Sequence, residues 1–328
     1  MQKLPNLHPK QQPLRDQLSS KKNIQPLLIA GPTGVGKSSF AAELAQRIGG
    51  EIVNADAYQI YIGMATLTSQ PDAHMRRLVP HHLYGQIDPA REFSAADYLA
   101  LVRPCVKEIQ ERKRRPILVG GTGMYLKAFL YRLDTQPPID ETLREELQKL
   151  SLPELLDRLS DCDSGALEII DIKNPRRVLR ALEIVLQTKK PFVESRKSWQ
   201  ADPIPHTAFF LNRDRKELHT RIEKNVRGMF ANDVREEILV LEAASRPPGK
   251  TARAAIGYTR ICEAISEHPK GLPQFALEEL IEKIIIDTRR YAKRQCTWFR
   301  AQQTFHPVSL SEKGFDLDSF TQKFSIEA

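Results

Sequence analysis

The amino-acid sequence predicts an α/β fold of the phosphate-loop (P-loop) NTPase-like type: a parallel sheet flanked by helices, with a smaller inserted helical domain. Residues 31–38, GPTGVGKS, fit the phosphate-loop pattern G-x-x-x-x-G-K-[S/T]. The apolar run 26–30 precedes this loop, and a run with helical spacing, 39–45, follows it. Strand-like and helix-like runs then alternate along the chain. This alternation indicates a parallel sheet that binds ligands at the carboxyl ends of its strands.

Further strands are expected at 51–56, at 115–119 before the glycine turn 120–123, and at 206–211. Helical patterns occupy 124–130, 215–244 and 275–300. Between 139 and about 198 the sequence is helical and poor in strands, with leucines at 143, 147 and 150 at helical spacing. We therefore expect a loose leader (1–24), a first core segment (25–138), an inserted helical domain (139–200), a second core segment with C-terminal helices (201–310) and a tail (311–328).

The phosphate loop predicts a site for a di- or triphosphate. Its glycines let backbone N–H groups face an anion at the start of a helix. Lys37 can reach the terminal phosphates, and the Ser38 hydroxyl can bind Mg²⁺. The predicted phosphate-binding residues are Gly31, Pro32, Thr33, Gly34, Val35, Gly36, Lys37 and Ser38. Because kinases, ATPases and transferases all use such a loop, the loop alone does not identify the reaction.

Composition narrows the class of protein. The chain has 328 residues and a formal net charge of +8. It contains no run of about 18 apolar residues and no apolar N-terminal segment, so we expect a cytoplasmic protein without a membrane segment. The cysteines at 105, 162, 262 and 296 are far apart, and no histidine stands at ligand spacing, which argues against a zinc site and a disulfide framework.

Basic residues cluster in four stretches, 107–115, 176–180, 213–227 and 289–300, and the last stretch also contains aromatic residues. Clustered cations with neighbouring aromatic rings suit a partner with a phosphate backbone and stackable bases. The alternative is an ordinary solvated surface.

Seven motifs follow one another over roughly residues 25–305. They are GPTGVGKS (31–38), NADAYQIY (54–61), VPHHL (79–83), GGTGMY (120–125), NPRRVLRALE (174–183), IGY (256–258) and YAKRQCTWFR (291–300). In this order and spacing they resemble the bacterial tRNA dimethylallyltransferases, also called tRNA isopentenyltransferases, of the IPP transferase family.

The resemblance implies transfer of a dimethylallyl group from its diphosphate to N6 of the adenosine immediately 3′ of the anticodon. The substrates would be tRNAs that read codons beginning with U, and the product N6-isopentenyladenosine. Asp56 matches the general base of the family, with a Mg²⁺ ligand or a helix cap as the alternative role. Lys37, Thr33 and Arg221 match groups that act on the diphosphate, although Thr33 could serve the turn alone and Arg221 could lie on a solvated face.

The resemblance also implies Mg²⁺ as cofactor, dimethylallyl diphosphate as co-substrate and the tRNA anticodon stem-loop as partner. We expect the protein to be a monomer. The residues predicted to contact tRNA are Asp56, Ala57, Tyr58, Gln59, Thr122, Arg144, Arg176, Arg177, Val178, Leu179, Arg180, Arg253, Ile256, Gly257, Tyr258, Lys293, Arg294, Gln295, Cys296, Thr297, Trp298, Phe299 and Arg300. For at least one of Trp298 and Phe299, packing in the core is the favoured alternative.

The sequence departs from the family pattern at four positions. Ala65, Leu67 and Gln70 replace an acid, a glycine and a lysine, and Asp233 stands where a glycine is common. None of the four lies in the phosphate loop or at Asp56. Two other functions remain possible at this point: a phosphate-loop kinase of a small molecule or nucleoside, and an RNA-binding protein that has a nucleotide loop without catalysis.

Overall fold

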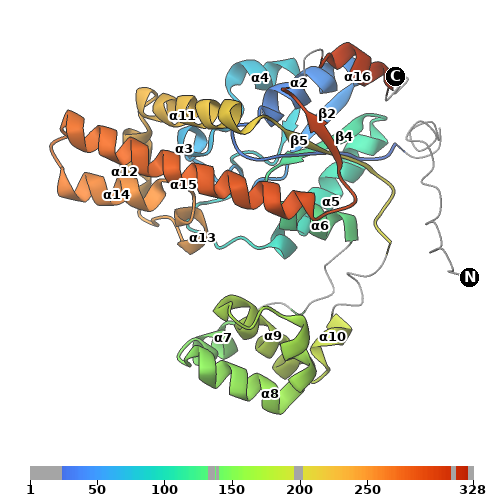
Figure 1. Cartoon of the computed structure of the whole chain (residues 1–328), viewed down its shortest axis with the longest axis vertical. Helices are drawn as coiled ribbons and strands as arrows, with labels where there is room; N and C mark the ends of the chain where they lie inside the picture. Colours follow the sequence, from blue (N-terminus) through green and yellow to red (C-terminus); the bar gives the residue numbers. More distant parts are fainter. Residues whose placement is uncertain (1–23, 132–136, 138–139, 196–201, 312–314, 324–328) are drawn as a thin grey trace, which may run out of the picture. The chain divides into compact units, whose positions relative to one another are not determined.

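The structure, a computed structural model, describes residues 24–131, 137, 140–195, 202–311 and 315–323 (Figure 1). Residues 1–23 of the predicted leader and parts of the predicted tail lie outside the described residues. The chain forms two compact units. One consists of the residues up to Leu126 together with those from Pro205 onward, and the other is Lys127–Ile204.

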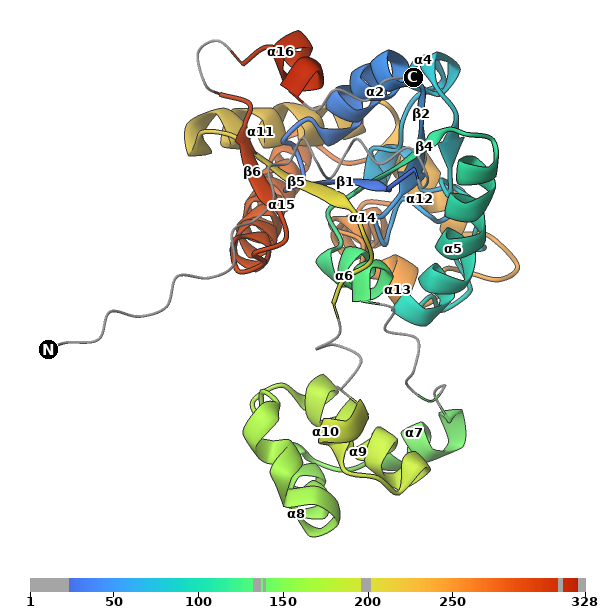
Figure 2. The same ribbon diagram turned by 90° about the vertical axis from the view of Figure 1, so that its right-hand side faces the viewer.

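The first unit contains a six-stranded parallel sheet within the described residues, with the order β3-β2-β4-β1-β5-β6. Its strands are β1 (Leu27–Ala30), β2 (Gly50–Asn54), β3 (His81–His82), β4 (Arg115–Gly120), β5 (Thr207–Asn212) and β6 (His306–Ser309). Strands β1 and β4 are buried along their whole length, as expected for strands covered on both faces. Strand β1 lies between β4 and β5, so the phosphate loop leaves the middle of the sheet (Figure 2). The predicted α/β fold class is confirmed.

Helices pack on both faces of this sheet and beyond its edge (Figures 1 and 2). They are α2 (Lys37–Ile48), α3 (Ala65–Thr68), α4 (Ala73–Leu78), α5 (Ala95–Glu111), α6 (Gly123–Tyr131), α11 (Arg215–Ala231), α12 (Val234–Glu242), α13 (Lys250–Arg253), α14 (Tyr258–Glu267), α15 (Gln274–Arg300) and α16 (Leu317–Lys323). Helix α5 begins with a Ser94–Asp97 capping box, whereas α2 begins at Gly36 without any side-chain cap. The first N–H groups of α2 are therefore free to bind a ligand.

The second unit is helical, with α7 (Glu141–Leu147), α8 (Leu152–Ile169), α9 (Pro175–Thr188) and α10 (Phe192–Ser195). These helices bury a core of their own, in which Leu159, Val178 and Leu182 are fully buried. The helical insertion predicted at 139–200 falls inside this unit, whose bounds at Lys127 and Ile204 are wider. The C-terminal half of α6, from Lys127 onward, therefore belongs to the second unit.

A buried carboxylate joins two helices of this second unit. Glu183 on α9 is 1% exposed, and its two oxygens accept hydrogen bonds from Nε and Nη2 of Arg144 at 2.6 and 2.8 Å. Arg180 donates to the same carboxylate at 3.1 Å and to the carbonyl of Pro137 at 2.7 Å. Because a buried acid needs paired charges, this cluster fixes α7 against α9.

We predict that Glu183→Ala destabilises the second unit. Removing the acid leaves two guanidinium groups without their counter-charge, which costs about 3 kcal/mol for a buried partner of this kind. Chemical denaturation should report the loss. The control is Glu168→Ala on α8, whose side chain is exposed and should leave the unfolding free energy within about 0.5 kcal/mol of the parent. Equal stability of the two variants would contradict the role given to Glu183.

Candidate functional site

Four chain segments that follow neighbouring strands meet at the carboxyl edge of the sheet. The phosphate loop follows β1, Asp56 lies two residues after β2, Thr122 follows β4, and Arg213 follows β5. A cavity of about 310 Å³ lies at this edge, and its lining includes Lys37, Ser38, Asp56 and Arg221. The structure thus brings the predicted phosphate loop, the predicted base and the predicted arginine to one cavity.

The phosphate loop has the conformation that its glycines permit. Gly34 and Gly36 have φ values of 80° and 101°, which only glycine adopts readily. A turn is closed by the N–H of Val35, which donates to the carbonyl of Pro32 at 3.3 Å. Lys37 Nζ donates to the same carbonyl at 2.9 Å. The lysine is therefore held over the loop before any phosphate arrives.

The charge of Lys37 is sensitive to its surroundings. Burial lowers the pKa of its ammonium from 10.5 to about 8, although Asp56 and Cys296 act in the opposite direction. A bound diphosphate would favour the charged form and raise this pKa again. Binding of an anion at the loop is thus coupled to protonation of Lys37.

Asp56 is positioned by its neighbours, and one of its oxygens stays available. The fully buried Asn54 accepts a hydrogen bond from the Asp56 N–H at 2.8 Å and donates to the carbonyls of Asp56 and Leu83. Asp56 Oδ1 accepts from the N–H of Tyr58 at 3.0 Å, while Oδ2 has no partner among the described residues. Burial, with Asp56 nearby, raises the pKa of the Tyr291 phenol, so this phenol faces the cavity uncharged.

The turn after β4 holds the Asp56 segment in place. Thr122 Oγ1 accepts a hydrogen bond from the N–H of Ala57 at 2.9 Å, and the N–H of Thr122 donates to the carbonyl of Ala55 at 3.3 Å. A Cβ on Gly120 would lie only 2.0 Å from that carbonyl oxygen. Glycine is therefore required at 120 for the two segments to approach so closely.

Gln295 on α15 connects this turn to the phosphate loop. Its Oε1 accepts a hydrogen bond from the N–H of Thr33 at 2.9 Å, and its Nε2 donates to the carbonyl of Gly121 at 3.0 Å. The side chain is 6% exposed. The Trp298 ring packs against Gly123, where a Cβ would lie 2.3 Å from Cε3. The glycine-rich turn thus makes room for two side chains of α15.

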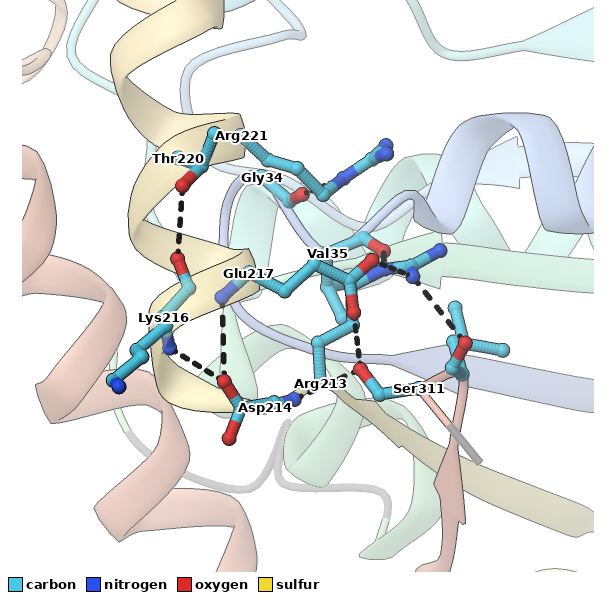
Figure 3. A network of polar contacts seen from close by, with 10 residues as sticks. Gly34, Val35, Arg213, Asp214, Lys216, Glu217, Thr220, Arg221 and Ser311 are labelled. Atoms are coloured by element: carbon cyan, nitrogen blue, oxygen red, sulfur yellow. Dashed lines mark hydrogen bonds and ion pairs between the residues drawn. The ribbon is translucent and has the colours of Figure 1, made fainter. Parts of the chain in front are cut away.

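Two arginines donate hydrogen bonds to the backbone of the phosphate loop (Figure 3). Arg221 Nε donates to the carbonyl of Gly34 at 2.9 Å, and Arg213 Nε donates to the carbonyl of Val35 at 2.8 Å. Glu217 pairs with Arg213 and accepts a hydrogen bond from the Ser311 hydroxyl. The family resemblance had assigned Arg221 to the diphosphate, not to the loop backbone. The loop contact of Arg213 was not predicted, although its place directly after β5 was a signal for it.

The structure places several of the residues predicted to contact tRNA in the interior of the fold. Val178 and Tyr258 are fully buried, Phe299 is 1% exposed and stacks on Phe210, and Gln295 forms the bridge described above. Their side chains belong to the interior of the fold, which does not fit a direct contact with RNA. The packing alternative is thus confirmed for Phe299.

Other predicted tRNA contacts are engaged in ion pairs or remain exposed. Arg253 pairs with Glu242, which also accepts a hydrogen bond from the Tyr258 hydroxyl. Arg144 and Arg180 bind Glu183. The exposed members of the predicted set are Arg176, Arg177, Lys293, Arg294, Thr297 and Arg300.

The departures from the family pattern have defined surroundings. Gln70 Nε2 donates to the carbonyl of Tyr61 at 3.0 Å, and its Oε1 accepts from Arg76 at 3.1 Å. Leu67 is 4% exposed and lines the cavity. Asp233 has a φ of 55° and precedes α12, a left-handed conformation that explains why glycine is favoured there.

The sheet topology and the phosphate loop define a phosphate-loop α/β protein. Its cavity contains groups that can bind a polyphosphate ester and an acid, Asp56, that can accept a proton. The family model described as IPP transferase matches residues 59–302. The tRNA dimethylallyltransferase of Syntrophobacter fumaroxidans is 39% identical over 85% of this chain and 82% of its own length. That of Geobacter sulfurreducens is 36% identical over 94% and 99%.

A solved structure agrees with these relatives. The tRNA isopentenylpyrophosphate transferase of Bacillus halodurans superposes with a TM-score of 0.65 at 32% identity, covering 92% of this chain and 97% of its own. The chain belongs to the IPP transferase family, whose curated relatives here are prenyltransferase enzymes acting on tRNA.

The low pKa of Lys37 predicts how diphosphate binding depends on pH. Below pH 8 the ammonium is charged in the free protein, whereas above pH 8 it loses its proton and must regain it on binding. The affinity should therefore fall by up to about tenfold per pH unit above pH 8, with proton uptake.

Isothermal titration with dimethylallyl diphosphate at pH 7 to 9.5, in two buffers of different ionisation enthalpy, measures this coupling. Lys37→Arg is the matched control. Its guanidinium stays charged throughout this range, so no proton uptake at this side chain accompanies binding. A parent protein whose affinity is constant up to pH 9.5 would contradict the prediction.

Proposed function

We propose that this protein transfers the dimethylallyl group of dimethylallyl diphosphate to N6 of the adenosine immediately 3′ of the anticodon, in tRNAs that read codons beginning with U. The observation that carries the proposal is that the phosphate loop and Asp56 line the same cavity. A leaving diphosphate and a base are the two groups that such a transfer requires. Membership of the IPP transferase family supports the same reaction.

One set of residues stabilises the leaving diphosphate, and Asp56 accepts the proton of the nucleophile. As the allylic C–O bond breaks, negative charge grows on the diphosphate, next to Lys37, Arg221 and the free N–H groups at the start of α2. Contacts that strengthen as this charge develops lower the barrier of the chemical step. The N6 amine forms the new C–N bond, and its proton passes to Asp56 Oδ2, the oxygen that accepts no hydrogen bond from the described residues.

The surroundings of Ser38 fit a Mg²⁺ ion at the diphosphate. Ser38 lines the cavity, and its hydroxyl has no partner among the described residues. Within the described residues no three His, Cys, Asp or Glu side chains gather as a metal site, so the remaining ligands would be phosphate oxygens and water. When bound, the ion would neutralise part of the charge on the leaving diphosphate.

The proposed RNA partner is the anticodon stem-loop. Exposed cations suited to a phosphate backbone are Arg176 and Arg177 on α9 of the second unit, and Lys293, Arg294 and Arg300 on α15 of the first. Among the described residues no helix is long and apolar enough to cross a membrane. The monomeric state stays a prediction, which light scattering in solution tests.

We predict that Asp56→Asn keeps the binding of dimethylallyl diphosphate but reduces transfer to tRNA by about 10²–10⁴, the usual contribution of a general base. The assay follows radiolabel from the diphosphate into tRNA, with nucleoside mass spectrometry to locate it. Asp72→Asn is the matched control, since Asp72 caps α4 and does not line the cavity.

Three outcomes would change the account. Near-parental transfer by Asp56→Asn would remove Asp56 as the base. If Asp56→Asn binds the diphosphate more weakly, and excess Mg²⁺ restores both binding and full turnover, Asp56 would be reassigned as a metal ligand. The alternative function, a phosphate-loop kinase, would be favoured if label from ATP enters a nucleoside and no label from dimethylallyl diphosphate enters tRNA.

A further inference from the structure

The cavity has an apolar part that phosphate chemistry does not use. Besides the polar groups described above, its lining contains Leu67, Met229, Ile256 and Ile284. Leu67 and Ile284 are buried, at 4% and 2% exposure. A diphosphate ester places its charged half at the phosphate loop, so its hydrocarbon half needs apolar walls of this kind.

Leu67 and Ile284 converge on the backbone of Gly257. From the position that a Cβ would take on Gly257, Ile284 Cδ1 is 3.3 Å away and Leu67 Cδ1 is 3.5 Å away. Both are contact distances, and Gly257 itself has a φ of 91°. Side chains from two other segments of the chain therefore pack against the backbone of Gly257.

A second set of contacts fixes where Leu67 lies. Glu237 on α12 accepts hydrogen bonds from the N–H groups of Thr66 at 2.7 Å and Leu67 at 2.9 Å, one on each carboxylate oxygen. The other end of α3 is held by Gln59, whose amide donates to the carbonyls of Thr68 and Ser69. Because α3 is anchored at both ends, Leu67 is a fixed part of the cavity wall rather than a side chain on a free loop.

We propose that Leu67 sets the length of the prenyl group that this protein accepts, by closing the apolar part of the cavity behind a five-carbon chain. This inference rests on the proposed function. Leucine at this position leaves space for a dimethylallyl group and excludes a ten-carbon geranyl group, whose second isoprene unit would overlap the Leu67 side chain.

The test compares dimethylallyl diphosphate with geranyl diphosphate as donors to tRNA. Leu67→Ala removes three carbon atoms from the cavity wall. One methylene in a hydrophobic pocket changes kcat/KM by roughly 10–200-fold, so the ratio of kcat/KM for geranyl over dimethylallyl diphosphate should rise at least about tenfold. Titration of each diphosphate without tRNA should show the same change of preference in Kd.

Leu241→Ala is the matched control. Leu241 is 7% exposed on α12 and contacts Gly63, next to the same short helix, but does not line the cavity. It loses the same three carbons from a buried site, so its donor preference should equal that of the parent. Leu67→Val gives a smaller step in the same direction if thermal unfolding finds Leu67→Ala unfolded.

The results separate this inference from the function on which it rests. A parent protein that transfers no dimethylallyl group to tRNA would refute the proposed function. A parent that is active, with folded Leu67 variants whose donor preference is unchanged, would overturn the role of Leu67 alone. A shift of equal size in Leu241→Ala would also overturn it, because general loosening would then explain the change.

Discussion

The site depends on one buried amide, that of Gln295. Phosphate loops are held by the strand and helix on either side of them, but here the loop is also joined to the turn after β4 through a side chain of α15. A buried amide with both of its ends bonded tolerates little displacement, because any shift leaves a polar group unpaired. The same turn holds the Asp56 segment through Thr122. Gln295 therefore sets the position of the phosphate loop relative to the acid.

The hydrogen-bonded path from loop to acid alternates between backbone groups and two side chains, those of Gln295 and Thr122. It runs from the N–H of Thr33 through Gln295 to Gly121, and from the neighbouring Thr122 to Ala57. Glycine is needed in the turn because Ala55 and α15 approach it within contact distance. A proton acceptor whose segment is held by such hydrogen bonds varies less in position than one on a free loop. This geometry suits a reaction in which bond breaking at the diphosphate and proton removal must occur together.

Sequence reasoning found the fold and the centre of the site because their signals are local. The phosphate loop is one continuous motif between a strand and a helix, and Asp56 is the last residue of a predicted strand, 51–56, that ends at the same edge of the sheet. The bridge of Gln295 and the anchoring of α3 by Glu237 join residues far apart in the chain, and no local pattern contains them. The position of Arg213 directly after β5 was a local signal, but it did not name Val35 as the partner. Motif membership also did not reveal that Val178 and Tyr258 are buried, since a motif does not distinguish a buried position from an exposed one.

The most direct measurement of the central claim is hydrogen–deuterium exchange of the parent and of Gln295→Leu, combined with their rates of prenyl transfer. We expect faster exchange at Thr33 and in the turn at 120–123, and a rate of transfer about 10²-fold lower, the usual cost of a small misplacement of reacting groups. Gln302→Leu is the control, because its amide donates only to the carbonyl of Trp298 at the end of α15. Unchanged exchange in both segments, together with a parental rate of transfer in Gln295→Leu, would contradict the account.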